Sequence, residues 1–174
     1  MRQVLSLVAL VTGLGIVLAA SPHDAQAMDK ANYSGKYLAE RHKNAPSGPT
    51  DSTLEVVQTA DFIEFAKVEL GKRATGRCPF NGLDGDYTSP GGVPGKCKAQ
   101  FKDKYLILEI VVVTHPQPAL PMRMHTKERW QLSADAKILT IKSDVDSPDV
   151  SRDVSAVVAS DMSGTQKYMR TDSK

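Results

Sequence analysis

Cys78 and Cys97 are the only thiols in the chain, and they bound a segment rich in glycine and proline, CPFNGLDGDYTSPGGVPGKC. Two thiolates could bind a metal ion, but neither cysteine belongs to a CxxC pair or has a histidine nearby. A disulfide would close a loop of roughly 20 residues and add on the order of 3 kcal/mol to stability in the chain-entropy model. We therefore expect a Cys78–Cys97 disulfide, which leaves no thiol to act as a nucleophile.

Three histidines and two groups of aspartates are the candidate metal ligands. His115 and His125 lie at the two ends of a proline-rich connection, and His42 lies far upstream. A zinc site needs a third or fourth ligand at close range, and the sequence offers none beside the two neighbouring histidines. We therefore expect the histidines to lie in solvent-exposed loops.

The aspartates make calcium the other candidate ion, since Ca²⁺ takes several oxygen ligands from one loop. Neither group has the spacing of an EF-hand, and Asp beside Gly or Pro is common in turns. We expect no metal and no cofactor. The aspartates concerned are Asp84 and Asp86 in the cysteine-bounded segment, and Asp144, Asp146 and Asp149 in SDVDSPD.

Catalytic motifs are missing: the chain contains no G-x-S-x-G elbow, no HExxH and no phosphate-binding glycine loop. Glu109 is the one charged residue in the otherwise mainly apolar stretch YLILEIVVVT at 105–114. A buried carboxylate is costly unless it is paired, so Glu109 could face a cavity, or it could face solvent or an arginine. We expect a protein that is not an enzyme; the enzymatic alternative would use Glu109 with a histidine.

Residues 1–27 have the three parts of a secretory signal peptide: a basic start at Arg2, an apolar run from Val4 to Ala20 and a small-residue cleavage site ending at Ala27. A membrane anchor is the alternative, because the run approaches spanning length. The run is weakly apolar, however, and no positively charged cluster follows it. We expect cleavage after Ala27 and a periplasmic or secreted protein without a membrane span.

The remaining chain, 28–174, suits a single domain. The whole sequence has 22 Lys plus Arg against 20 Asp plus Glu, and no basic block. This balance and the predicted export exclude nucleic acid as a partner. An exported protein also folds where disulfides persist.

Short runs of β-branched, aromatic and aliphatic residues alternate with polar turns along the mature chain, whereas helical periodicity is nearly absent. The stretch at 105–114 is apolar on both faces apart from Glu109, which favours a central strand covered on both sides. In the stretch at 124–132, Met124, Trp130 and Leu132 share one face. The candidate strands are 33–41, 53–59, 62–70, 71–77, 98–102, 105–114, 124–132, 138–142, 150–160 and 165–170.

Consecutive short strands joined by turns form meanders, and barrel closure removes the exposed edges of such a sheet. We therefore expect an all-β fold, an antiparallel up-and-down β-barrel of about eight to ten strands. The alternative is an open β-sandwich.

Three motifs carry a resemblance to a known family: YSGKY at 33–37, WQLSADAKILTI at 130–141 and YMR at 168–170. Their order and spacing resemble small exported bacterial proteins with a lipocalin-like barrel, which begin with a Gly-x-Trp strand, carry a Leu-Ser-x-Asp-Gly-Lys hairpin and end on an aromatic-x-Arg strand. LDG at 83–85 resembles a shorter turn in such chains. The resemblance implies a fold rather than a chemistry.

The chain departs from this pattern at two residues and one segment. Tyr37 stands where the family usually has Trp, against which the terminal arginine would pack. Ala136 stands where the hairpin usually has Gly, and a positive φ there would strain Ala by roughly 1 kcal/mol. The cysteine-bounded segment has no counterpart in the pattern.

We expect a monomeric barrel that binds an apolar or amphiphilic small molecule, with aromatic side chains lining the site and one charged side chain as a polar handle. Aromatic residues on strands can equally fill the core. The expected lining is Trp130, Tyr37, Phe65 and Phe101, and the handle is Glu109 or Arg170.

The alternative function is a packed barrel that binds an envelope protein or the cell wall through its long loops, at 42–53, 78–97 and 115–123. This alternative predicts an exposed apolar patch in the segment 78–97, formed by Pro79, Phe80, Leu83 and Val93.

Overall fold

A computed structural model describes residues 31–40, 52–115, 121–148 and 163–171. The described residues form ten strands, and no helix among them is long and apolar enough to cross a membrane. The predicted signal peptide and the predicted strand at 150–160 lie outside the described residues. The strands are β1 (Gly35–Ala39), β2 (Thr53–Gln58), β3 (Phe62–Glu69), β4 (Lys72–Pro79), β5 (Gly85–Thr88), β6 (Pro94–Lys102), β7 (Tyr105–Thr114), β8 (Met122–Leu132), β9 (Ile138–Asp146) and β10 (Gly164–Arg170).

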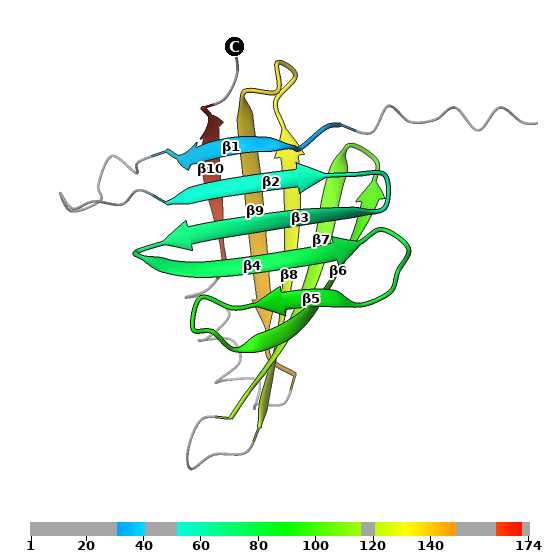
Figure 1. Ribbon diagram of the computed structural model, residues 1–174, viewed down its shortest axis with the longest axis vertical. Coiled ribbons are helices and arrows are strands. Elements are labelled where there is room, and N and C mark those ends of the chain that lie inside the picture. The colour runs from blue at the N-terminus through cyan, green and yellow to red at the C-terminus, as the bar shows by residue number, and fades with distance from the viewer. Residues whose placement is uncertain (1–30, 41–51, 116–120, 149–162, 172–174) are drawn as a thin grey trace, which may run out of the picture.

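Each strand pairs antiparallel with the next, and β1 pairs with both β2 and β10, so the sheet closes into a barrel. The predicted up-and-down barrel is confirmed, and the open sandwich is wrong. In Figure 1, β1–β5 run across the front and β6–β10 run lengthwise behind them. The barrel is therefore flattened, and the two halves of its wall cross at a steep angle.

The two ends of the barrel differ. At one end, here the turn end, short connections at 59–61, 80–84, 103–104 and 133–137 join the strands. At the other, here the long-loop end, the chain passes from β1 to β2 through 40–52, from β7 to β8 through 115–121 and from β9 to β10 through 147–163.

The core follows from the two-residue period of the strands, because alternate side chains point into the barrel. The largest fully buried side chains are those of Trp130, Tyr33, Tyr37 and Tyr168, packed among leucines and isoleucines. Strand β7 is covered less than expected. Leu106, Leu108 and Ile110 face inward, but Val113 on the outer face is 39% exposed.

Glycines on the inner wall make room for aromatic rings. In one row across the sheet, Phe65 lies opposite Gly76, Gly76 opposite Tyr87 and Tyr87 opposite Gly95. A Cβ on Gly76 would lie 2.5 Å from Phe65 Cε1, and one on Gly95 would lie 3.1 Å from Tyr87 Cδ1. Large and small residues therefore alternate around the wall, which is how a narrow barrel accommodates its rings.

The cysteine-bounded segment is a piece of the wall, contrary to the expectation of a loop. It contains β5, which the sequence reading missed because GDYT offers only Tyr87 as an inward apolar side chain. Strand β9 is also longer than expected: Asp144 and Asp146 continue it on the outer face, opposite Lys127 and His125.

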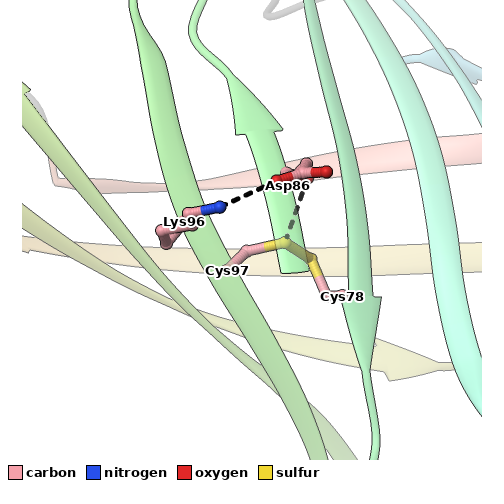
Figure 2. Close-up of polar contacts among 4 residues, drawn as sticks. All are labelled: Cys78, Asp86, Lys96 and Cys97. Atoms are coloured by element: carbon pink, nitrogen blue, oxygen red, sulfur yellow. Dashed lines mark hydrogen bonds and ion pairs between the residues drawn. A yellow bond between two sulfur atoms is a disulfide. The ribbon is translucent and has the colours of Figure 1, made fainter. Parts of the chain in front are cut away.

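The predicted Cys78–Cys97 disulfide is confirmed, and it joins β4 to β6 across the start of β5 (Figure 2). The two Cα atoms are 5.1 Å apart, close to the spacing of adjacent strands, about 4.8 Å. Beyond the start of β5, towards the turn end, β4 and β6 therefore lie directly beside each other. Both sulfurs are buried, and Gly85 beside them has no room for a Cβ, which would overlap the carbonyl oxygen of Arg77.

Replacing both cysteines by alanine tests this cross-link. We expect the free energy of unfolding to fall by roughly 3 kcal/mol, because the unfolded chain regains the entropy of an open loop of about this length. Urea unfolding followed by circular dichroism measures the loss, with the reduced and oxidised wild type as references. A loss below about 1 kcal/mol would contradict a stabilising role for the disulfide.

The β8–β9 turn holds Ala136 at φ 55°, in the left-handed region. An alanine is strained there, so Ala136→Gly should raise the free energy of unfolding by about 1 kcal/mol. Ala134→Gly in the same turn is the matched control, because Ala134 does not have a positive φ. In the control variant, the free energy of unfolding should fall by up to about 1 kcal/mol, because glycine gives the unfolded chain greater freedom. Thermal unfolding compares the two variants, and equal effects would contradict the assigned strain.

Candidate functional site

Polar side chains occupy one part of the barrel interior, as the strand period requires. On β3, Lys67 and Glu69 follow Ile63 and Phe65 at two-residue spacing, so all four face inward. On β8, Glu128 lies two residues before the buried Trp130 and therefore also faces inward. With Tyr87 of β5 and Tyr168 of β10, these residues form what we term the inner polar cluster: Lys67, Glu69, Tyr87, Glu128 and Tyr168.

The charged members of the cluster have defined partners. Lys67 Nζ lies 3.3 Å from Glu69 Oε2, with 22% and 37% of the two side chains exposed. Trp130 Nε1 donates a hydrogen bond of 2.7 Å to Glu128 Oε2. The ion pair is thus partly accessible to solvent, whereas Glu128 is held by a buried neutral donor.

The two tyrosines of the cluster are influenced by the same two carboxylates. Burial, together with the negative charges of Glu128 and Glu69, raises the pKa of Tyr87 to about 12. Burial also raises the pKa of Tyr168 strongly, and the same two carboxylates add to it. Both hydroxyls therefore lie within the electrostatic reach of the same pair of glutamates.

The Tyr168 hydroxyl has no hydrogen-bond partner among the described residues, although the residue is fully buried. A buried hydroxyl without a partner costs about 1–3 kcal/mol relative to one that is hydrogen-bonded. Such a group in a native interior calls for an explanation, and a bound polar molecule would supply one.

A pocket of about 380 Å³ opens beside the cluster at the long-loop end. Lys67 and Glu69 line it from β3, while Ser143 and Gln166 line it from β9 and β10. Strands β2 and β1 separate β3 from β10 in the wall. The pocket therefore lies across the interior, and its volume is within the range of small-molecule sites, roughly 300–1,000 Å³.

The expected aromatic lining lies largely in the packed core instead. The rings of Phe65 and Trp130 are 5.7 Å apart, and Phe101 packs 5.1 Å from Phe80. Trp130 and Tyr37 are 1% and 2% exposed. These side chains fill the turn-end half of the barrel and form the floor below the inner polar cluster.

Arg170 lies at the turn end, away from this cluster. Its Nη2 atom donates to the Tyr37 hydroxyl at 2.6 Å and to the Ser34 carbonyl oxygen at 2.7 Å. The guanidinium also lies 5.2 Å above the centre of the Tyr37 ring. Arg170 thus closes the turn end, and the arginine packing described for the resembled family is present here with Tyr in place of Trp.

Glu109 faces the outside of the barrel. It lies opposite Lys98 and Lys127 on the neighbouring strands, and its carboxylate is 4.0 Å from Lys127 Nζ. His125 lies on the same outer face, and no hydrogen bond joins it to Glu109 in the described part of the chain. The structure therefore gives Glu109 the role of an exposed charge opposite lysines.

No group of three or more metal-binding side chains occurs within the described ranges. Asp86 is exposed and lies 2.8 Å from Lys96 Nζ, and this hydrogen bond lowers the pKa of Asp86 (Figure 2). His115 is exposed and Asp144 lies 3.7 Å from Lys142 Nζ. Of the other predicted candidates, His42 and Asp149 lie outside the described residues.

The expected apolar patch of the segment 78–97 does not form as one surface. Pro79, Phe80 and Leu83 lie at the turn end of β5, whereas Val93 lies at its other end. Phe80 packs against the core, and only Leu83 is highly exposed among the four, at 65%.

No family model matches the chain, and a search of curated proteins finds no match either.

Sequence reasoning missed every member of the inner polar cluster. The signal that would have found Glu128 was present, because Glu128 shares the even-numbered face of its strand with Met124 and Trp130. Lys67 and Glu69 share the face of Ile63 and Phe65 in the same way. Polar residues at inward positions, rather than polar residues in apolar runs, mark this interior.

The raised pKa values of Tyr33, Tyr87 and Tyr168 predict sensitivity to alkali. Folding favours the neutral phenol, so the free energy of unfolding is constant while the tyrosines are protonated in both the folded and the unfolded chain. It falls once the unfolded chain ionises above about pH 10, by about 1.4 kcal/mol per pH unit for each such tyrosine. Tyr168→Phe should reduce this slope by about 1.4 kcal/mol per pH unit. Urea unfolding between pH 9 and pH 11.5 measures the slope, and an unchanged slope would contradict the burial of this phenol.

Proposed function

We propose that this protein is an exported, non-enzymatic small-molecule-binding protein whose site is the inner polar cluster and the pocket beside it. The observation that carries the proposal is the fully buried Tyr168 hydroxyl, which has no partner among the described residues. A ligand that hydrogen-bonds to this group would remove its desolvation cost, and that gain would add to the affinity.

The division of the interior supports this site. The turn-end half is filled by aromatic and aliphatic side chains, which makes a rigid floor. The other half carries polar side chains beside an open pocket, so a ligand could enter without unfolding the core. Small-molecule sites commonly combine such a preformed apolar surround with a few converging polar groups.

The ligand we propose is small and amphiphilic. Its polar group would meet the inner polar cluster, and its apolar part would lie along the inner face of β7 and β8 towards the long-loop end. That face carries Val112, Met122 and Met124, all partly buried. Methionine adapts its shape to varied apolar ligands.

Export and the lipocalin-like family are parts of the same proposal. The disulfide supports export, since disulfides persist in oxidising compartments. The closed barrel, Arg170 packed on Tyr37 and the left-handed Ala136 of the β8–β9 turn support the family resemblance.

Tyr168→Phe tests the proposed site, because it should change stability and binding in opposite directions. Removing an unpartnered buried hydroxyl should raise the free energy of unfolding by about 1 kcal/mol at pH 7. The same change should lower ligand occupancy about fivefold to tenfold, because one hydrogen bond to the ligand is lost. Tyr105→Phe, on the outer face, is the control and should leave occupancy unchanged.

Native mass spectrometry of each protein purified from its own cell envelope measures occupancy. The wild type should carry a reproducible small mass, reduced in Tyr168→Phe. A reproducible protein adduct without any small mass would contradict the proposal and support the alternative, an interaction module acting through its loops.

A further inference from the structure

The pocket at the long-loop end has one charged wall and one neutral wall. Lys67 and Glu69 line it from β3, whereas the described residues that line it from β9 and β10 are all uncharged. Ser143 and Gln166 are the partly buried polar residues of this second wall. A ligand in the pocket would therefore meet two opposite charges side by side, both supplied by one strand.

The Lys67–Glu69 ion pair is the least exposed ion pair in the described part of the chain. Its side chains are 22% and 37% exposed, whereas those of the outer pair Lys36–Glu55 are 67% and 57% exposed. A ligand that enters the pocket would remove more of the water around Lys67 and Glu69. Such desolvation is costly unless other charges or hydrogen bonds replace the water.

Two other charged side chains of this part of the interior do not line the pocket. Lys72 lies opposite Glu69 at the β3–β4 turn, but it is exposed, and water screens such a charge. The carboxylate of Glu128 accepts a hydrogen bond from the neutral indole of Trp130. Among the described residues, the charge inside the pocket is therefore that of the Lys67–Glu69 pair, which sums to zero.

We infer that the pocket selects amphiphiles with a zwitterionic head group, in which a carboxylate and a protonated amine lie on neighbouring atoms. This inference rests on the proposed function and names the class of its ligand. The ligand's carboxylate would accept from the ammonium group of Lys67, and its amine would donate to the carboxylate of Glu69. Ser143 and Gln166 on the opposite wall can each donate and accept hydrogen bonds, so they suit either half of the head group.

Ligands with a single charge are disfavoured by the same ion pair. A fatty acid would bind to Lys67 but would bring its negative charge beside Glu69. An alkyl amine would bind to Glu69 and would meet the like charge of Lys67. A neutral head group would displace water from both charges without supplying a charge to either of them. The pair therefore provides specificity through the cost of the wrong ligands as well as through contacts with the right one.

Three probes with one alkyl chain separate the contributions of the two head-group charges: 2-aminooctanoate, octanoate, which lacks the amine, and heptylamine, which lacks the carboxylate. At pH 7 the amines are protonated and the carboxylates are ionised. Calorimetric titration of the purified protein should show the tightest binding for 2-aminooctanoate. We expect its affinity to exceed that of either single-charge probe by about tenfold or more, because each of those probes makes one charge-assisted hydrogen bond fewer.

Changing one member of the ion pair should set the preference between the two single-charge probes. Lys67→Met leaves the charge of Glu69, so heptylamine should bind more tightly than octanoate, and Glu69→Gln should give the opposite order. Each variant should bind 2-aminooctanoate about tenfold more weakly than the wild type. Lys36→Met and Glu55→Gln, which break the exposed pair on the outer face, are the matched controls and should change none of the three affinities.

Circular dichroism checks that each variant folds, and the comparison of the three probes on the wild type needs no variant. Octanoate or heptylamine binding to the wild type as tightly as 2-aminooctanoate would overturn the inference and leave the proposed binding function intact. The same order of octanoate and heptylamine in Lys67→Met and Glu69→Gln would do the same. If no probe binds, the zwitterion inference is overturned, while the small mass that the protein carries from its own envelope decides the proposed function separately.

Discussion

A chain of hydrogen bonds links the closure of the barrel to its interior site. Arg170 Nη2 donates to the Tyr37 hydroxyl, which donates to the carbonyl oxygen of Tyr33 at 2.8 Å. The Tyr33 hydroxyl donates to the carbonyl oxygen of Trp130 at 3.1 Å, and the Trp130 indole donates to Glu128. The chain starts where β10 meets β1 and ends at the carboxylate in the inner polar cluster. The orientation of Glu128 therefore depends on the same contacts that close the sheet.

This arrangement separates the packed part of the interior from its polar part. The rings that fill the turn end need glycines opposite them, and the disulfide fixes the wall where β5 starts and β4 meets β6. Both features keep the wall narrow at that point. Towards the long-loop end, Lys67, Glu69, Ser143 and Gln166 replace the rings. The floor of the pocket is then held by packing, and its polar groups are positioned by strands, as the proposed ligand binding would require.

The fold could be predicted because the sequence patterns that indicate it are local and recur along the chain. Alternating apolar residues, short turns and the absence of helical periodicity all indicate one antiparallel meander, and closure follows from the cost of exposed edges. Strand β5 could not be predicted, because its conformation is imposed by β4, β6 and the disulfide rather than by GDYT. Strand β9 continues past its predicted end to Asp146. The side chains of Asp144 and Asp146 point to water, and charged side chains on the solvent face do not prevent strand pairing.

The site was harder to predict, since a residue's role depends on which face of the wall it occupies. Glu109 interrupts an apolar run and looked significant, but its odd position on β7 points it outward. Glu128 lies in a charged stretch and looked ordinary, yet its position places it two residues from Trp130 on the inner face. A search for charged residues in apolar runs selects Glu109. A search for polar residues at inward, even-numbered positions of the strand selects Glu128. The register alone does not bring Glu69 and Glu128 together, because β3 and β8 are not neighbours in the wall.

The unfavourable groups of this barrel are concentrated in one place. A buried hydroxyl without a partner and a carboxylate without a cation both oppose folding, whereas the aromatic floor, the disulfide and Arg170 all favour it. Residues that serve only stability would have been apolar at these inward positions, as they are everywhere else along the inner faces of β3 and β8 near the turn end. A fold that keeps polar groups against its own stability is keeping them for another purpose. Because Lys67 and Glu69 of the same cluster line the pocket at the long-loop end, that purpose is best sought in what the pocket binds.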